Sequence, residues 1–73
     1  MNPPSAPFAA PYHVDLAVNF DDMADDQRRI EAENWCCHQT KSKWFRRILI
    51  RQGIARFEFD DQKEAALFRL FCL

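Results

Sequence analysis

Apolar and polar residues alternate along residues 12–20, YHVDLAVNF, in the pattern typical of a β-strand. Successive side chains of a strand point to opposite faces of a sheet, so residues at every second position share one face. The apolar face here would carry Tyr12, Val14, Leu16, Val18 and Phe20. The segment therefore predicts one strand with a buried face and a polar face.

Acidic residues directly after this strand predict the start of a helix. Asp21 or Asp22 can accept hydrogen bonds from the first unpaired backbone amides, as an N-cap does. Asp25 and Asp26 would then lie near the amino-terminal end, where the helix dipole favours negative charge. We therefore expect a helix that begins just after the capping aspartate.

The buried face of this helix has to be inferred from spacing. Met23, Ile30 and Cys37 share one face at helical spacing, whereas Trp35 lies well off it. The pattern predicts that this stripe packs on the rest of the protein. Replacing Cys37 should therefore matter more than replacing Cys36.

Residues 43–59, KWFRRILIRQGIARFEF, predict two strands around the only glycine of the chain. Gly53 can adopt the positive φ that a tight connection requires. In the second strand Ala55, Phe57 and Phe59 alternate with charged residues and should face inward. The first strand has apolar side chains on both faces, so its register is ambiguous, and a bulge or a second contact surface would explain it.

The carboxy-terminal segment DDQKEAALFRLF predicts a second helix. Asp61 is the expected N-cap, and Glu64, three residues on, is its expected partner in a capping box. Leu67, Phe68 and Phe71 fall on one apolar stripe of this helix. The expected helix is thus amphipathic.

The expected elements follow the order β-α-β-β-α, which predicts a small α+β fold with two helices on one face of a three-stranded sheet. A chain of 73 residues is expected to hold a single domain, which we place at residues 12–73. All four prolines lie in MNPPSAPFAAP, so we expect residues 1–11 to be a flexible, Pro-rich tail.

Net charge is −1, which argues against a surface that is basic throughout, as in many nucleic-acid-binding domains. The charges are nevertheless separated along the chain. Six acidic residues fall within residues 21–33 against two arginines, whereas residues 41–51 carry five basic residues and no acid. We therefore expect a strong local charge asymmetry.

Cysteine content indicates the compartment. Three cysteines cannot all pair within one chain, and the sequence shows neither a secretory leader nor an apolar run of membrane-spanning length. We expect free thiols, a cytoplasmic protein, no membrane association and a monomer.

Cys36, Cys37 and His38 are the most evident candidates for metal binding or covalent chemistry. Consecutive helical residues diverge by about 100°, so these three cannot readily converge on one ion. A single glycine leaves no phosphate-binding loop and no G-x-S-x-G turn. We expect no metal, no cofactor and no enzymatic activity.

The basic segment 41–51 allows two functional interpretations. Cations beside aromatic side chains can bind nucleic acid, as in a small repressor, or can anchor a protein partner. A third possibility is that the segment faces the acidic helix of the same protein or solvent. The candidate partner-binding residues are Tyr12, Lys43, Trp44, Arg46, Arg47 and Arg51.

Three stretches carry a resemblance to a known group of proteins: ENWC at residues 33–36, KWFRR at 43–47, and ARFEFDDQKEAALFRLFCL at 55–73. With them the chain resembles small phage-encoded transcription regulators that bind host bacterial RNA polymerase. The resemblance implies action in the host cytoplasm on the polymerase itself, without direct sequence-specific DNA binding. It further implies docking on the amino-terminal region of the β′ subunit, inhibition of initiation through interference with the σ-containing holoenzyme, and antitermination.

Overall fold

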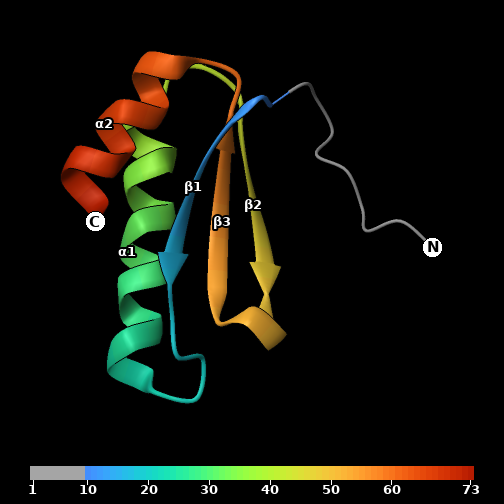
Figure 1. Cartoon of the computed structure of the whole chain (residues 1–73). Helices are drawn as coiled ribbons and strands as arrows, with labels where there is room; N and C mark the ends of the chain where they lie inside the picture. The colour runs from blue at the N-terminus through green and yellow to red at the C-terminus, as the bar shows by residue number, and fades with distance from the viewer. Residues whose placement is uncertain (1–9) are drawn as a thin grey trace.

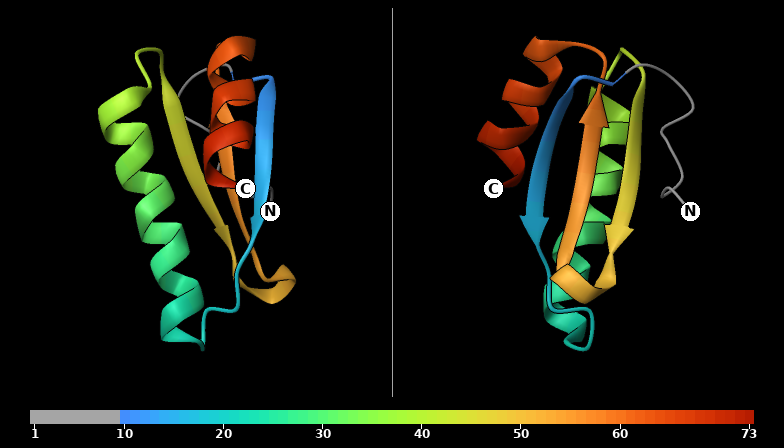
Figure 2. Two further views of the ribbon diagram at one scale, coloured as in Figure 1. Left: turned by 90° about the vertical axis from the view of Figure 1, so that its left-hand side faces the viewer. Right: turned by 45° about the vertical axis from the view of Figure 1, so that its right-hand side comes forward.

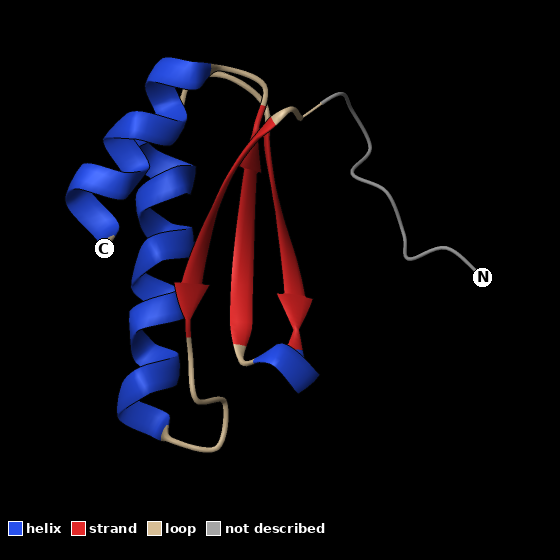
Figure 3. Cartoon of the chain, in the orientation of Figure 1, coloured by secondary structure: helices blue, strands red, loops and turns tan. Residues whose placement is uncertain are grey.

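The computed structural model describes residues 10–73 and contains three strands, two α-helices and one short 3₁₀ helix (Figures 1 and 3). The tail expected at residues 1–11 lies outside the described residues, except for residues 10 and 11. In chain order the elements are β1 (Tyr12–Ala17), α1 (Met23–Gln39), β2 (Trp44–Leu49), η1 (Ile50–Gln52), β3 (Ile54–Phe59) and α2 (Gln62–Cys72).

The strands form one antiparallel sheet in the order β1-β3-β2. β3 pairs with both neighbours, so β1 and β2 run in the same direction on either side of it. Both helices lie on one face of the sheet, and the other face has no helix over it (Figure 2). The predicted α+β fold and the β-α-β-β-α order are therefore confirmed.

The core is an aromatic cluster between β3 and α2. Phe57, Phe59 and Phe68 are fully buried. The ring of Phe68 lies 4.6 Å from that of Phe57 and 5.4 Å from that of Phe59, measured between centroids. Val14 and Leu16 of β1 complete this side of the sheet, as the alternation of β1 predicts.

Helix α1 begins as the sequence predicts but buries a different face. Its N-cap is Asp22, whose side chain accepts a hydrogen bond from the Ala24 amide at 2.9 Å. The buried residues are Ala32 and Cys36, whereas Met23 is 89% exposed.

The expectation that the stripe through Cys37 is buried is thus wrong. Cys37 is exposed, and Trp35, which the sequence analysis placed off the stripe, packs against the core together with the fully buried Cys36. The physical reason is steric: small side chains at Ala32 and Cys36 let the helix backbone approach the core closely. The spacing of apolar residues in the sequence does not show that the helix backbone has to lie this close to the core.

The connection between β2 and β3 follows the prediction at its glycine. Gly53 has φ 65°, in the left-handed region, and directly follows the 3₁₀ turn η1. β2 pairs with β3 residue by residue from Trp44 to Leu49, so it contains no bulge. All six residues of β2 are half-buried, so the mixed apolar pattern reflects an edge strand that neither face covers completely.

Helix α2 has the predicted N-cap without the capping box. The Asp61 carboxylate accepts a hydrogen bond from the Lys63 amide at 2.8 Å. Glu64 instead accepts one from the backbone amide of Lys41 at 3.2 Å, which ties α2 to the loop after α1. Of the predicted apolar stripe only Phe68 is buried.

We predict that Cys36→Ser destabilises the fold whereas Cys37→Ser does not. Burial raises the pKa of the Cys36 thiol to about 12, and a hydroxyl, which is more strongly hydrated than a thiol, would cost about 1–3 kcal/mol at this fully buried position. At the exposed Cys37 the same change should stay within about 0.5 kcal/mol. Urea unfolding measures both, and a larger loss for the Cys37 variant would show that the helix is rotated.

Candidate functional site

The solvent side of α2 carries an exposed apolar surface, which we call the α2 strip: Leu67, Leu70 and Phe71. Leu70 is 70% exposed, Phe71 65% and Leu67 43%. Residues three and four positions apart on a helix are neighbours, so these side chains form one continuous surface. Their exposure follows from the burial of Ala65 and Phe68 on the opposite side of the same helix.

The α2 strip continues onto α1 through an aromatic contact. The Phe71 and Trp35 rings stack with centroids 6.1 Å apart and an interplanar angle of 30°. Trp35 in turn meets the buried Phe68 edge-on at 5.9 Å. Trp35 and Phe71, with Arg28 and Glu31, line a hollow of about 280 Å³ between the two helices. The strip is therefore in contact with the core through Trp35.

An apolar helix face of this kind is unusual on a protein that acts alone. Contiguous exposed apolar patches on a protein surface commonly mark interaction sites. The α2 strip is the most evident candidate for a protein-binding surface. The spacing of apolar residues does not predict this surface, because Leu67 and Phe71 share a stripe with the buried Phe68.

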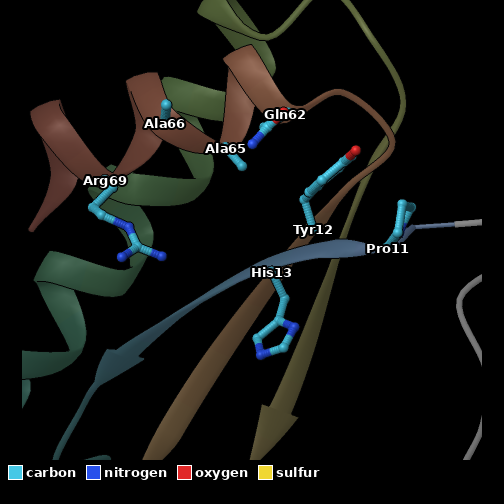
Figure 4. Close-up of a pocket in the computed structure, with 7 residues that line it drawn as sticks. All are labelled: Pro11, Tyr12, His13, Gln62, Ala65, Ala66 and Arg69. Carbon is cyan, nitrogen blue, oxygen red and sulfur yellow. The ribbon is translucent and has the colours of Figure 1, made fainter.

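A second surface feature is a groove of about 440 Å³ between β1 and α2 (Figure 4). Ala65 and Ala66 of α2 line it with small side chains, while Tyr12 and Gln62 lie toward one end and Arg69 toward the other. Tyr12, one of the predicted partner-binding residues, thus lines this groove. In the sequence, the only sign of the groove is the pair Ala65 and Ala66. Two small side chains form a groove here only because β1 lies opposite them.

The predicted residues of the basic segment are divided between the two faces of the sheet. Arg46 points to the helix side, where it bonds to Glu33 of α1 at 3.1 Å. Glu33 also pairs with Arg29 of α1, so Arg46 belongs to a network within the protein. This arrangement corresponds to the interpretation in which the basic strand faces the protein's own acidic helix.

Arg47 occupies the opposite, open face of the sheet. It forms an ion pair with Glu58 of β3 at 3.2 Å. Trp44 lies on the helix side, where its ring stacks on Phe57 with centroids 6.4 Å apart. The cation and the aromatic side chain that the sequence places close together therefore point in different directions.

Lys43 and Arg51 lie at opposite ends of β2, in the loop before it and in η1 after it. Tyr12 lies on the far side of the sheet, beyond β3. The structure thus does not bring the six predicted residues together on one surface. Their role in partner binding stays a prediction.

The charges of the open face are largely paired. Arg56 of β3 donates two hydrogen bonds to the carboxylate of Asp15 on β1, at 2.8 and 3.1 Å. The bond from Arg56 holds the pKa of Asp15 below its usual range, with a smaller contribution from the charge of Arg56. With the pair between Arg47 and Glu58, this leaves the middle of the open face with little net charge.

Within residues 10–73 no group of three or more histidine, cysteine, aspartate or glutamate side chains could hold a metal ion. In the same part of the chain, no helix has both the length and the apolar character needed to cross a membrane.

In comparisons with known proteins, no family model, no curated protein and no solved structure matches this chain.

We predict that the bond between Asp15 and Arg56 makes stability depend on pH in the acid range. The pKa of Asp15 is lower in the folded protein than its ordinary value of 3.8. The pair therefore stabilises the fold fully at pH values above 3.8, and this stabilisation is lost as the pH falls through the folded-state pKa. Asp15→Asn should thus cost less than about 1 kcal/mol near neutral pH, since the pair is partly exposed. The cost should decrease as the pH falls below 3.8.

Urea unfolding at neutral pH and at about pH 2 measures this difference. The matched control is Asp60→Asn, which removes the same charge at an exposed carboxylate that makes no ion pair within residues 10–73. It should change stability little at either pH. An equal loss for Asp15→Asn at both pH values would mean that Asp15 acts through packing instead of charge.

Proposed function

We propose that this protein is a phage regulator that binds host RNA polymerase, and that the α2 strip is the centre of the contact. The class of partner comes from the resemblance of residues 33–36, 43–47 and 55–73 to small phage regulators. The surface comes from the exposure of Leu70 and Phe71 on α2. By this proposal the protein acts as a monomer in the host cytoplasm.

The observation that carries the proposal is the α2 strip itself. Side chains at the centre of an interface, once desolvated, often each contribute about 2 kcal/mol or more to binding. Phe71 is held in place by Trp35, so little side-chain freedom would be lost when a partner covers it. The strip is therefore a preorganised, apolar surface for a protein partner.

The proposed mechanism is competition for a surface of the polymerase. Bound at the amino-terminal region of the β′ subunit, the protein would interfere with the σ-containing holoenzyme and inhibit initiation. Retained during elongation, it would make the polymerase read through terminators. No chemistry is required of the protein, because both effects follow from occupying a site.

Nucleic acid is the less favoured partner because the basic residues are divided and partly neutralised. Arg46 and Arg47 point to opposite faces, and each has a carboxylate partner. A phosphate backbone would have to displace these carboxylates before it could use either arginine. We therefore expect only weak binding to free duplex DNA.

We predict that Leu70→Asp weakens binding to the polymerase holoenzyme by about 2 kcal/mol, or roughly thirtyfold in Kd. The reason is that a carboxylate at the centre of the strip would be desolvated on binding. The control is Ile50→Asp in η1, because Ile50 is also 70% exposed but lies in the turn after β2. Anisotropy of the labelled protein, titrated with core polymerase and with holoenzyme, measures both variants.

If the two variants bind the polymerase with equal affinity, the α2 strip is not part of the contact. Binding of neither core nor holoenzyme by the parent protein would refute the polymerase proposal altogether. Light scattering of the free protein is the companion measurement. A dimer that Leu70→Asp dissociates would assign the strip to a second copy of the chain.

We also predict that the parent protein inhibits transcription from a host promoter and increases terminator read-through, while it binds free duplex DNA only weakly. Lys43→Glu combined with Arg51→Glu tests the basic residues without breaking an ion pair, since neither forms one within residues 10–73. If these residues lie at the periphery of the contact, the double variant should weaken inhibition much less than Leu70→Asp does. Tight DNA binding that falls steeply between 50 and 200 mM salt would favour the repressor interpretation instead.

A further inference from the structure

The sheet leaves one edge of β1 without a strand partner among residues 10–73, because β1 lies at the outside of the order β1-β3-β2. An unpaired edge presents a row of backbone donors and acceptors to which another extended chain can bind. Which groups face outward follows from the register. The Val18 amide bonds to the Gly53 carbonyl at 2.8 Å, in line with the pairing of β1 and β3.

Residues of antiparallel strands alternate between those that bond to the neighbour and those that do not. Since Val18 bonds to the β3 side, the backbone groups of Leu16 and Val14 also point toward β3. Those of Ala17, Asp15 and His13 point to the open edge. In agreement with this, the Ala17 carbonyl accepts a bond from the Arg28 side chain at 3.4 Å, outside the sheet.

The groove between β1 and α2 lies beside this open edge (Figure 4). A strand added to β1 would turn every second side chain toward the helix side, where Ala65 and Ala66 leave space. Alternate residues of a strand are about 6.6 Å apart, and residues four apart on a helix rise by about 6 Å. Two successive helix-side residues of an added strand would therefore meet Ala65 and Arg69.

The groove has the charge of an anion-accepting site. Its lining contains no acidic residue. Arg69 is exposed and makes no hydrogen bond or ion pair with any residue from 10 to 73. A carboxylate at the second helix-side position would supply the partner that Arg69 lacks, through a charge-assisted and geometrically specific contact.

The other edge of the sheet, β2, is less suited to the same use. The hollows between β2 and α1 are smaller, about 250 and 280 Å³, and acidic residues contribute to both. Arg46, which lines both, is already bonded to Glu33. An incoming carboxylate would meet a neutralised network there.

We propose that the groove between β1 and α2 binds an extended acidic segment of a protein partner, which adds as a fourth strand at the β1 edge. The segment places a small or β-branched side chain over Ala65 and Ala66, and an aspartate or glutamate two residues away on Arg69. The inference does not rest on the polymerase proposal, because it concerns a different side of α2 and specifies the chemistry of the bound segment.

The test is selection of a displayed library of random heptapeptides on the immobilised full chain. The same selection is run on Arg69→Glu and on Lys63→Glu. Lys63 is also exposed on α2 and lies outside the groove, so its variant changes net charge equally. The parent and Lys63→Glu should enrich peptides with an acidic residue among β-branched ones, and Arg69→Glu should not.

An enriched peptide is then synthesised, and its Kd is measured by fluorescence anisotropy. Arg69→Glu should weaken binding about tenfold or more, and Ala66→Phe, which fills the groove from an exposed position, should weaken it similarly. Thermal unfolding of each variant establishes that it folds. Addition of the peptide to the ¹⁵N-labelled parent should shift the amide signals of His13 and Asp15.

Three results would overturn the inference. One is the absence of enrichment on the parent protein. Another is enrichment of apolar peptides whose binding does not depend on Arg69, which would indicate that only the α2 strip is used. The third is binding that leaves the amides of His13 and Asp15 unshifted, because a strand added at this edge must contact them.

Discussion

The contact between Phe68 and the aromatic side chains of β3 determines most of what this protein presents to its surroundings. Phe68 is the one residue of α2 that reaches Phe57, Phe59 and Trp35 together. Removing such a side chain typically costs about 3–5 kcal/mol, a large share of the 5–15 kcal/mol that stabilises a whole domain. With Phe68 fixed inward, the rotation of α2 about its axis is fixed as well. Leu67, Leu70 and Phe71 must then face solvent, and Arg69 must face β1.

The clustering of basic residues in the sequence suggests a binding surface, but several charged side chains instead form ion pairs within the protein. Arg46 reaches across from β2 to Glu33, so it joins α1 to the sheet. Arg56 and Asp15 similarly join β3 to β1 on the open face. Such pairs are partly exposed and each contributes little to stability, but they determine which groups remain available to a partner. Two of the five positive charges of the basic segment, those of Arg46 and Arg47, are thus paired within the protein.

Much of the fold could be predicted from the sequence, because the relevant signals are local. Alternation identified β1 and β3, and Gly53 identified the turn. Carboxylates identified the cap at Asp61 and narrowed the other cap to Asp21 or Asp22, of which the structure has Asp22. The buried face of α1 could not be predicted in the same way. It depends on the small side chains of Ala32 and Cys36, which let the helix pack closely on the core. This requirement becomes visible only when the rest of the core is in place.

The candidate sites were harder to predict for a related reason. Arg46 and Arg47 are neighbours in sequence but lie on opposite faces of β2, and the carboxylates that pair with them come from α1 and β3. The α2 strip contains ordinary core residue types, and only the position of Phe68 decides that they are exposed. The groove needs β1 and α2 together, which are separated by most of the chain.

The topology also has a consequence for the way the protein folds. β2 and β3 are joined by a four-residue connection and can form a hairpin without long loop closure. β1 pairs with β3 across about forty residues, as the distance in sequence between Asp15 and Arg56 illustrates. Pairings of such long range form late and slowly in small domains. β1 is therefore the last strand to join the sheet. Until it pairs, the edge of β3 is unpaired and can bind another extended segment in its place.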